Sequence, residues 1–310
     1  MTTYPPLAPE AAQLIQAFRE AGSPSFHTLD LGTARKNYRA SCAKNGIAAQ
    51  QLAQVQDFNL GPFSVRLYQP GQAGGPAPVI LFFHGGCWGI GDLDTHDGLC
   101  RALAAESGLA LVAVDYRLAP EYRYPTAHED CRLALKWLVG SQEHGLEVSG
   151  LVLAGDSAGG QLAAVLAQEN SQGQAGLPIL AQVLLYPVLD LTMSTDSYRR
   201  VTEGYPLVAA TMEHFTRAYV PAGVDLASAA LSPGLAPLPE GLAPTYLVTV
   251  GHDPLADEGL AYGARLARAG VEVVSHHLPG YAHGLFTSAG ILAAGQEEVR
   301  AAARFIRERV

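Results

Sequence analysis

Residues 155–159 read Gly155-Asp156-Ser157-Ala158-Gly159, which places a serine between two glycines at the spacing of a nucleophile elbow. In such an elbow the chain passes directly from a strand into a helix, and the serine hydroxyl stands clear of the backbone. Only small residues two places before and after the serine avoid a collision, which explains the two glycines. Because the flanking residues 151–154 predict a buried strand and residues 158–169 predict a helix, the pattern indicates that Ser157 is a covalent catalyst.

The five-residue pattern needs support from the rest of the chain. The sequence contains 33 glycines, so a serine in an ordinary helix-initiating turn is an alternative explanation. A catalytic serine also requires a base, an acid and hydrogen-bond donors for the developing negative charge. The search for these partners decides between the two interpretations.

Length and composition favour one large α/β domain. The chain has 310 residues, of which 48% are hydrophobic, so it can bury a substantial core. The net charge of −9 argues against nucleic acid or an anionic membrane as a partner. No apolar run approaches the length of a membrane span, and residues 1–6 lack the basic and apolar character of a signal peptide.

The cysteines and histidines show no metal-binding spacing. The four cysteines are scattered without a CxxC pair, which predicts reduced thiols and a cytoplasmic protein. They are Cys42, Cys87, Cys100 and Cys131. The ten histidines include no HExxH pattern, and a phosphate-binding loop of the P-loop type is absent. We therefore expect neither a metal nor a nucleotide cofactor.

Apolar runs alternate with helical segments along most of the chain. Buried parallel strands are predicted at residues 79–83, 109–114, 151–154, 181–185, 245–250 and 271–275. Helices are predicted at residues 99–106, 129–138, 158–169, 259–269 and 296–310. Residues 63–68 alternate like a half-buried antiparallel strand. This order predicts an α/β fold with a mostly parallel central sheet and helices on both faces.

Two stretches depart from this alternation. Residues 1–50 predict helices that end near Gly46, and residues 189–242 contain one helical piece, 209–219, before a Pro/Gly-rich region. We expect residues 51–188 and 243–310 to form the core domain. The two remaining segments are expected to form a helical cap over the C-terminal edge of the sheet.

A base and an acid are predicted after the last two strands. Ser157, Asp253 and His283 occur in the chain order expected for a serine on a strand–elbow–helix unit. Asp253 follows the predicted strand 245–250, and His283 follows the predicted strand 271–275. Ligands bind at this edge of open α/β sheets. The histidine would take the serine proton, and the carboxylate would fix the histidine tautomer.

Other residues compete for these two roles. Asp257 is a second candidate for the acid, but it directly precedes a predicted helix, where an N-cap role is expected. Three further histidines are candidates for the base: His252, His276 and His277. Each lies inside or beside a predicted strand and is less able to reach the serine. We therefore favour Asp253 and His283.

Donors for an oxyanion are predicted in residues 84–88, His84-Gly85-Gly86-Cys87-Trp88, directly after the strand 79–83. Glycines there let backbone amides point into a pocket without obstruction by a side chain. We expect the N–H groups of Gly86, Cys87 and Ala158 to be the donors, while Gly85 mainly permits the turn. The alternative is an ordinary pair of glycines in a strand-to-loop connection.

These motifs together resemble the hormone-sensitive-lipase-like esterases, also called bacterial family IV esterases, of the α/β-hydrolase fold. The resemblance covers roughly residues 60–285. It is carried by residues 84–88 with Gly91-Asp92, Asp115-Tyr116-Arg117-Leu118-Ala119-Pro120-Glu121 with Pro125, residues 155–160, Asp253-Pro254-Leu255 with Asp257-Glu258, and His283-Gly284.

The resemblance implies a carboxylic-ester hydrolase that needs no cofactor and acts on small-molecule esters with short or medium acyl chains. It implies a helical cap, and it assigns Ser157 as nucleophile, Asp253 as acid and His283 as base. Residues 115–125 receive no catalytic role; their arginine and glutamate are expected to brace loops near the elbow. The same catalytic groups could also cleave amides, lactones or carbamates. A non-catalytic receptor for a small carboxylated ligand is a further alternative, but such receptors lack the histidine.

The substrate pocket and the oligomeric state are less well defined by the sequence. The candidate lining residues, each of which also fits ordinary core packing, are Trp88, Tyr186, Tyr205, Leu207, Phe215 and Leu285. The last strand and the last helix offer surfaces for a homodimer.

Cys87 departs from the family pattern, which usually has a third glycine at this place. If the backbone at Cys87 has a positive φ, the residue is strained by roughly 1–3 kcal/mol. The cysteine also places a thiol beside the predicted oxyanion donors. This leads to the hypothesis that a thiol-modifying reagent slows the enzyme by crowding the acyl pocket.

Overall fold

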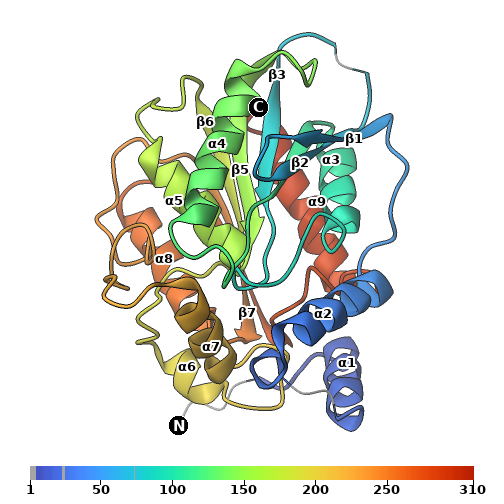
Figure 1. Ribbon diagram of the computed structural model, residues 1–310, viewed down its shortest axis with the longest axis vertical. Coiled ribbons are helices and arrows are strands. Elements are labelled where there is room, and N and C mark those ends of the chain that lie inside the picture. Colours follow the sequence, from blue (N-terminus) through green and yellow to red (C-terminus); the bar gives the residue numbers. More distant parts are fainter. Residues whose placement is uncertain (1–4, 23–24, 73) are drawn as a thin grey trace.

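The computed structural model describes residues 5–22, 25–72 and 74–310 and has a single mixed sheet at its centre (Figure 1). The sheet order is β1-β2-β4-β3-β5-β6-β7-β8. The strands are β1 (Gln54–Asn59), β2 (Ser64–Gln69), β3 (Ala77–Phe83), β4 (Ala110–Asp115), β5 (Val148–Asp156), β6 (Ile179–Leu185), β7 (Thr245–His252) and β8 (Val273–Ala282). β1 and β2 pair in antiparallel fashion, as do β2 and β4, and all other pairs are parallel.

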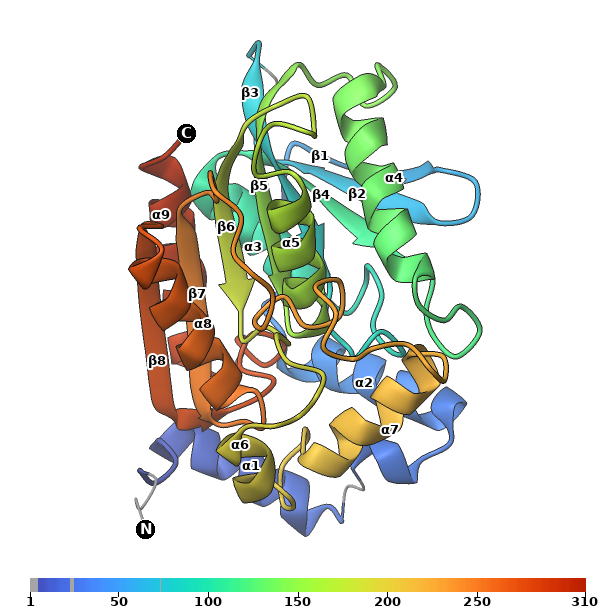
Figure 2. The same cartoon turned by 90° about the vertical axis from the view of Figure 1, so that its left-hand side faces the viewer.

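Helices cover both faces of the sheet. The helices of the described chain are α1 (Pro9–Glu20), η1 (Phe26–Thr28), α2 (Leu31–Asn45), α3 (Asp97–Ser107), α4 (Thr126–Gly140), α5 (Ala158–Glu169), α6 (Asp196–Arg200), α7 (Ala209–Tyr219), α8 (Ala256–Arg268) and α9 (Ala293–Arg307). In Figure 2, α4, α5 and α8 lie on one face, and α3 and α9 lie on the other. The predicted α/β fold with a mostly parallel sheet is therefore confirmed.

The two faces of the sheet carry separate hydrophobic cores. Leu81 of β3 packs in the core under α4, α5 and α8, while its neighbour Ile80 packs in the core under α3 and α9. Both side chains are fully buried. Because central strands are buried on both sides, their sequences are continuous apolar runs, which is why they could be recognised from the sequence.

The element boundaries correct the sequence prediction in three places. β1 was missed because it is an exposed edge strand, with Gln, Asp and Asn at four of its six positions. α6 was missed because it has only five residues. β8 does not end near residue 275 but continues through Pro279 and Gly280 to Ala282. Residues 1–4, the start of the predicted N-terminal segment and most of the stretch inspected for a signal peptide, lie outside the described residues.

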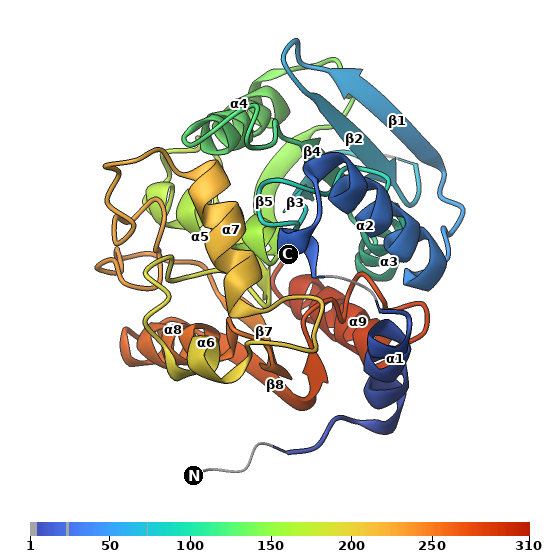
Figure 3. The same ribbon diagram turned by 60° about the horizontal axis from the view of Figure 1, so that its bottom comes forward.

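Helices from two distant parts of the chain lie across the C-terminal end of the sheet. Figure 3 shows α6 and α7 on one side of this end and α1 and α2 on the other. His27 of η1 contacts the Thr211 hydroxyl of α7 at 2.9 Å, and the Arg19 guanidinium of α1 donates to the Gly204 carbonyl at 2.9 Å. The segment between β6 and β7 therefore packs against the N-terminal segment.

The segment between β6 and β7 is held at its two ends. The Glu258 carboxylate oxygen Oε1 accepts hydrogen bonds from the backbone N–H groups of Leu189 at 2.6 Å and Asp190 at 3.2 Å. The Leu189 carbonyl accepts one from the Gly234 N–H at 2.9 Å. Burial raises the pKa of Glu258 well above its usual value. Leu189 is thus fixed through both of its backbone polar groups.

Residues 115–125 brace neighbouring segments, including the loop near the elbow, where the Ala119 N–H donates to the Trp88 carbonyl at 2.8 Å. Arg117 pairs with the buried Asp130 of α4 at 2.7 Å. Glu121 forms a bidentate pair with Arg35 of α2, with both oxygens at 2.8 Å. Arg35 also donates to the Ala119 carbonyl at 3.1 Å. The stretch therefore fixes α2 to the sheet domain.

None of the helices in the described part of the chain combines the length and the apolar character needed to cross a bilayer.

We predict that Gly159→Ala strongly destabilises the protein. A Cβ at this position would lie 1.9 Å from the Phe83 carbonyl oxygen and 2.6 Å from that of His84, both of which are backbone atoms. The free energy of unfolding, measured with urea, should fall by about 3 kcal/mol or more. Gly140→Ala is the matched control, because a Cβ there meets nothing within 4 Å. Equal stability of Gly159→Ala and the wild type would contradict the packing described here.

We predict that acid destabilises the protein partly through His128. This residue is buried, its Nδ1 lies 2.9 Å from the Tyr219 hydroxyl, and burial lowers its pKa to about 4. The unfolded chain binds a proton below about pH 6.5, whereas the folded chain does so only below about pH 4. The free energy of unfolding should therefore fall as the pH drops through this window, by up to about 1.4 kcal/mol per pH unit for this group.

The measurement is urea unfolding at pH 7, 6 and 5 for the wild type and His128→Gln. Glutamine stays neutral, so the variant should show a shallower pH dependence even if it is less stable overall. His84, whose pKa burial also lowers to about 4, keeps its contribution in both proteins. Identical slopes would mean that His128 is not a buried neutral group.

Candidate active site

Ser157 lies at a sharp turn between β5 and α5. Its backbone has φ 53° and ψ −119°, a conformation that is strained for a residue with a side chain. The turn is fixed because the Ser157 N–H donates to the Leu185 carbonyl at 2.8 Å and its carbonyl accepts from the Val188 N–H at 3.1 Å. Ala158 begins α5, so its N–H has no partner within the helix. The predicted strand–elbow–helix unit is present.

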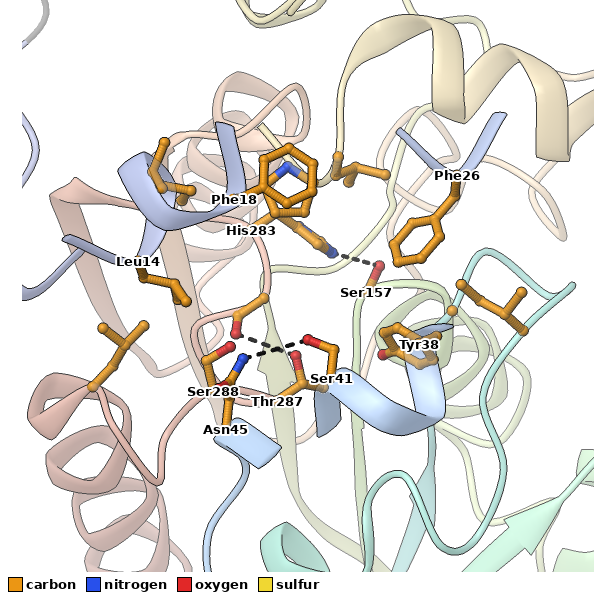
Figure 4. A pocket seen from close by; sticks show the side chains of 18 of the residues that line it. Leu14, Phe18, Phe26, Tyr38, Ser41, Asn45, Ser157, His283, Thr287 and Ser288 are labelled. Atoms are coloured by element: carbon orange, nitrogen blue, oxygen red, sulfur yellow. Dashed lines mark hydrogen bonds between the residues drawn. The ribbon is translucent and has the colours of Figure 1, made fainter. Parts of the chain in front are cut away.

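A hydrogen-bonded chain joins Ser157, His283 and Asp253. The His283 Nε2 lies 2.9 Å from the Ser157 Oγ, and the His283 Nδ1 lies 2.7 Å from the Asp253 Oδ2 (Figure 4 shows the first contact). Asp253 directly follows β7 and is fully buried, and His283 directly follows β8. With the Nδ1 proton donated to the carboxylate, Nε2 is left to accept the serine proton.

The competing candidates have other partners. Asp257 lies in the first turn of α8 rather than at its N-cap, and its Oδ2 accepts from the Ser197 N–H at 2.7 Å. The rival histidines contact side chains outside the hydrogen-bonded chain: His252 contacts Tyr205, His276 contacts Glu298, and His277 contacts Thr249. Among the described histidines, only His283 lies within hydrogen-bond distance of the Ser157 Oγ.

The glycine loop after β3 has two unused N–H groups beside Ser157. Gly86 and Cys87 line the same cavity as Ser157, with φ values of 115° and 51°. Their N–H groups donate no hydrogen bond to other residues of the described chain. The Gly85 N–H is different, because it donates to the Asp156 Oδ1 at 2.7 Å. The Gly85 N–H therefore already has an acceptor within the protein and helps to fix the loop.

Asp156 and His96 make a buried contact beside this loop. This contact was not predicted from the sequence. The Asp156 Oδ1 lies 3.1 Å from the His96 Nε2, and the two side chains are 2% and 1% exposed. Burial raises the pKa of Asp156, but attraction to His96 and the hydrogen bond from Gly85 outweigh it and hold the pKa below its usual value. The presence of an acidic residue, Asp156, directly before the elbow serine was the one sign in the sequence that a buried partner could be needed there.

Cys87 has a positive backbone φ, which the sequence alone could not decide. Its positive φ of 51° corresponds to about 1–3 kcal/mol of strain. Burial raises the pKa of the thiol to about 12, and the Sγ lies 3.8 Å from the Met212 sulfur. A thiolate is therefore scarce at neutral pH, which argues against ready modification by thiol reagents.

A cavity of about 400 Å³ opens onto Ser157 and His283. Of the predicted lining residues, Tyr186, Leu207 and Phe215 line it. The other three do not. Trp88 stacks on Tyr219 with ring centroids 4.7 Å apart, Leu285 is fully buried, and the Tyr205 hydroxyl contacts His252 at 2.8 Å.

Most of the remaining cavity wall was not predicted. It comes from α1, η1, α2 and the turns after β8. Nothing in the sequence of these segments distinguishes pocket residues from core residues. No group of three or more His, Cys, Asp or Glu side chains in the described part of the chain could hold a metal ion.

Comparisons with known proteins agree with this architecture. A family model described as the alpha/beta hydrolase fold matches residues 80–287. The ethyl acetate hydrolase of Pseudomonas putida is 36% identical over 296 residues, which cover 92% of each chain. The esterase LipI of Mycobacterium tuberculosis is 41% identical over 251 residues, 78% of this chain and 76% of that protein. The crystal structure of an α/β-hydrolase enzyme from the Lake Arreo metagenome has a TM-score of 0.90 at 35% identity, covering 97% of this chain and 98% of that one.

The chain belongs to the α/β-hydrolase family and, within it, to the hormone-sensitive-lipase-like, or bacterial family IV, esterases. It is an enzyme that hydrolyses carboxylic esters.

We predict that Cys87 resists alkylation in the folded protein. With the thiol 4% exposed and its pKa raised to about 12, iodoacetamide at pH 7.5 should modify it at least about a hundredfold more slowly than an ordinary free thiol. Mass spectrometry of tryptic peptides gives the rate, and urea-unfolded protein, in which the thiol is exposed, serves as the control. Fast labelling of the native protein, with a loss of activity that Cys87→Ala prevents, would instead support a reactive thiol.

Proposed function

We propose that Ser157, His283 and Asp253 are the catalytic triad with which this enzyme hydrolyses short- to medium-chain acyl esters. The observation that carries the proposal is the continuous hydrogen-bonded chain, with distances of 2.9 Å and 2.7 Å, that opens onto the cavity. A non-catalytic receptor on the same scaffold would need no such histidine. The family membership makes an ester the expected substrate.

The first half of the reaction forms an acyl-enzyme. The Ser157 Oγ attacks the ester carbonyl carbon while the His283 Nε2 takes its proton. Asp253 stabilises the resulting imidazolium, and this stabilisation is strong because the carboxylate is fully buried. His283 then gives the proton to the departing alkoxide, so the alcohol leaves and an ester to Ser157 remains.

The second half releases the acid. A water molecule in the cavity attacks the acyl-enzyme while His283 accepts one of its protons. Collapse of the tetrahedral intermediate returns this proton to the Ser157 oxygen. The product is a carboxylic acid, and the enzyme regains its starting state without a cofactor.

The N–H groups of Gly86, Cys87 and Ala158 form the oxyanion hole in this proposal. The first two are free of other hydrogen bonds in the described chain and lie at the cavity, and the third is the open first donor of α5. Gly85 is not a donor, because Asp156 occupies its N–H. Each donor in such a hole is worth roughly a hundred- to thousandfold in rate.

The segments 1–50 and 189–242 act as a cap in this proposal, and residues 51–188 with 243–310 form the catalytic core. Support comes from the cavity wall, to which α1, α2 and α7 contribute side chains. The apolar residues Leu14, Phe18 and Phe26 fit a short hydrocarbon chain. Four buried free cysteines fit a reducing compartment such as the cytoplasm.

We predict that Ser157→Ala lowers kcat for p-nitrophenyl butyrate by about 10⁴-fold or more, because no other group can form the acyl-enzyme. The far-ultraviolet circular dichroism spectrum and the melting temperature should show an intact fold. Ser141→Ala is the matched control, since Ser141 follows α4 at the opposite end of the sheet. Activity of Ser157→Ala close to that of the wild type would refute the assignment.

A further inference from the structure

The wall of the cavity beside the triad contains both apolar and polar side chains. The apolar side chains of Leu14, Phe18 and Phe26 lie on different sides of the contact between Ser157 and His283 (Figure 4). Four uncharged polar side chains also line the cavity: Ser41, Asn45, Thr287 and Ser288. Figure 4 shows these four gathered on one side of the contact between Ser157 and His283. We call them the polar end.

The polar end is built from two rigid segments that are joined to each other. Ser41 and Asn45 are four residues apart on α2 and so lie on one face of the helix. Thr287 and Ser288 lie in the turns that follow His283. The Gly290 N–H donates to the Asn45 carbonyl at 2.9 Å, which ties the end of α2 to these turns.

The polar end has hydrogen-bonding capacity that the protein does not use. The Ser288 Oγ and the Asn45 Oδ1 form no hydrogen bond with any other described residue, although the Ser288 residue is only 8% exposed. The one contact of the Asn45 Nδ2, with the Ser41 Oγ, is long at 3.4 Å. The Thr287 Oγ1 donates to the Gly284 carbonyl at 3.2 Å and still has free lone pairs.

Unused polar groups beside a binding cavity favour a ligand that satisfies them. Leaving such groups unpaired when an apolar ligand displaces water is costly, whereas a ligand with matching oxygens recovers the hydrogen bonds. Sites of this kind discriminate more strongly than apolar pockets do. Lys44 also lines the cavity and adds a further donor on the α2 side.

We propose that the polar end is a subsite for hydroxyl or carbonyl oxygens on one arm of the ester. The enzyme then prefers an ester with one hydrocarbon arm and one oxygen-bearing arm over an ester of the same shape with two hydrocarbon arms. This inference rests on the proposed function of the Ser157 site. It identifies Asn45 and Ser288 as the residues that determine specificity.

The test uses two pairs of esters that differ only by hydroxyl against methyl. For the alcohol arm, the pair is glycerol 1-monobutyrate and 2-methylbutyl butyrate. For the acyl arm, the pair is ethyl 3-hydroxybutyrate and ethyl 3-methylbutyrate. Acid release in a pH-stat gives kcat/KM for the wild type, Asn45→Leu and Ser288→Ala. Asn37→Leu is the matched control, because Asn37 is an exposed asparagine of α2 outside the cavity lining.

For one of the two pairs, the ratio of kcat/KM for the hydroxylated ester to that for the methylated ester should fall about tenfold in Asn45→Leu and Ser288→Ala, the effect of one lost hydrogen bond. The ratio should stay constant in Asn37→Leu. The pair that responds identifies which arm occupies the polar end. A purely structural role would lower the melting temperature and reduce both members of a pair equally.

Unchanged ratios in both pairs, in either folded variant, would overturn the proposed subsite while leaving the ester hydrolysis itself in place. Failure of the wild type to hydrolyse any of the four esters or p-nitrophenyl butyrate would instead contradict the proposed function. If Asn45→Leu does not fold, Ser288→Ala alone decides, because it removes one oxygen and creates no larger side chain.

Discussion

The close backbone approach between α5 and β3 is the constraint on which the site depends. At Gly159 the Phe83 carbonyl leaves no room even for a methyl group, since a Cβ would lie 1.9 Å from its oxygen. The turn in which Ser157 has its positive φ of 53° lies two residues before this contact. The glycine loop begins directly after Phe83, so the same contact places the Gly86 backbone near Ser157, the nucleophile that we propose. One close contact therefore underlies both the proposed nucleophile and the proposed oxyanion donors.

The sheet and the three hydrogen-bonded residues were predictable because their signals are local or topological. Buried parallel strands are continuous apolar runs, and parallel strands end at a common edge, so Asp253 and His283 could be placed near Ser157 from their positions after two strands. The exposed strand β1 gave no such signal. The contact of Asp156 with His96 depends on packing between residues 60 positions apart, and the sequence signalled it only through the acidic residue inside the elbow. The same dependence on packing holds for the pocket wall, where Trp88 proved to be a core residue stacked on Tyr219.

The hydrogen-bonded residues Ser157, His283 and Asp253 and the wall of the cavity come from different parts of the fold. The residues proposed to react, Ser157, Asp253 and His283, each directly follow a strand of the sheet. Much of the cavity wall comes from helices outside the sheet, and these helices are attached both by apolar packing and by polar contacts such as the pair of Arg35 with Glu121. Variation in the helices can thus change the shape and polarity of the cavity while the hydrogen bonds of His283 stay as they are.

The way in which the segment between β6 and β7 is attached also separates it structurally from the sheet. Its beginning is held by the buried Glu258, and Gly234, near its end, returns to bond the same Leu189. A segment whose two ends meet adds little strain to the domain that receives it, and its length can change at a small entropic cost. The whole segment could therefore be exchanged between related proteins, in evolution or by design. Such an exchange would change the cavity wall and the substrate selectivity but leave the sheet and the residues that follow its strands unchanged.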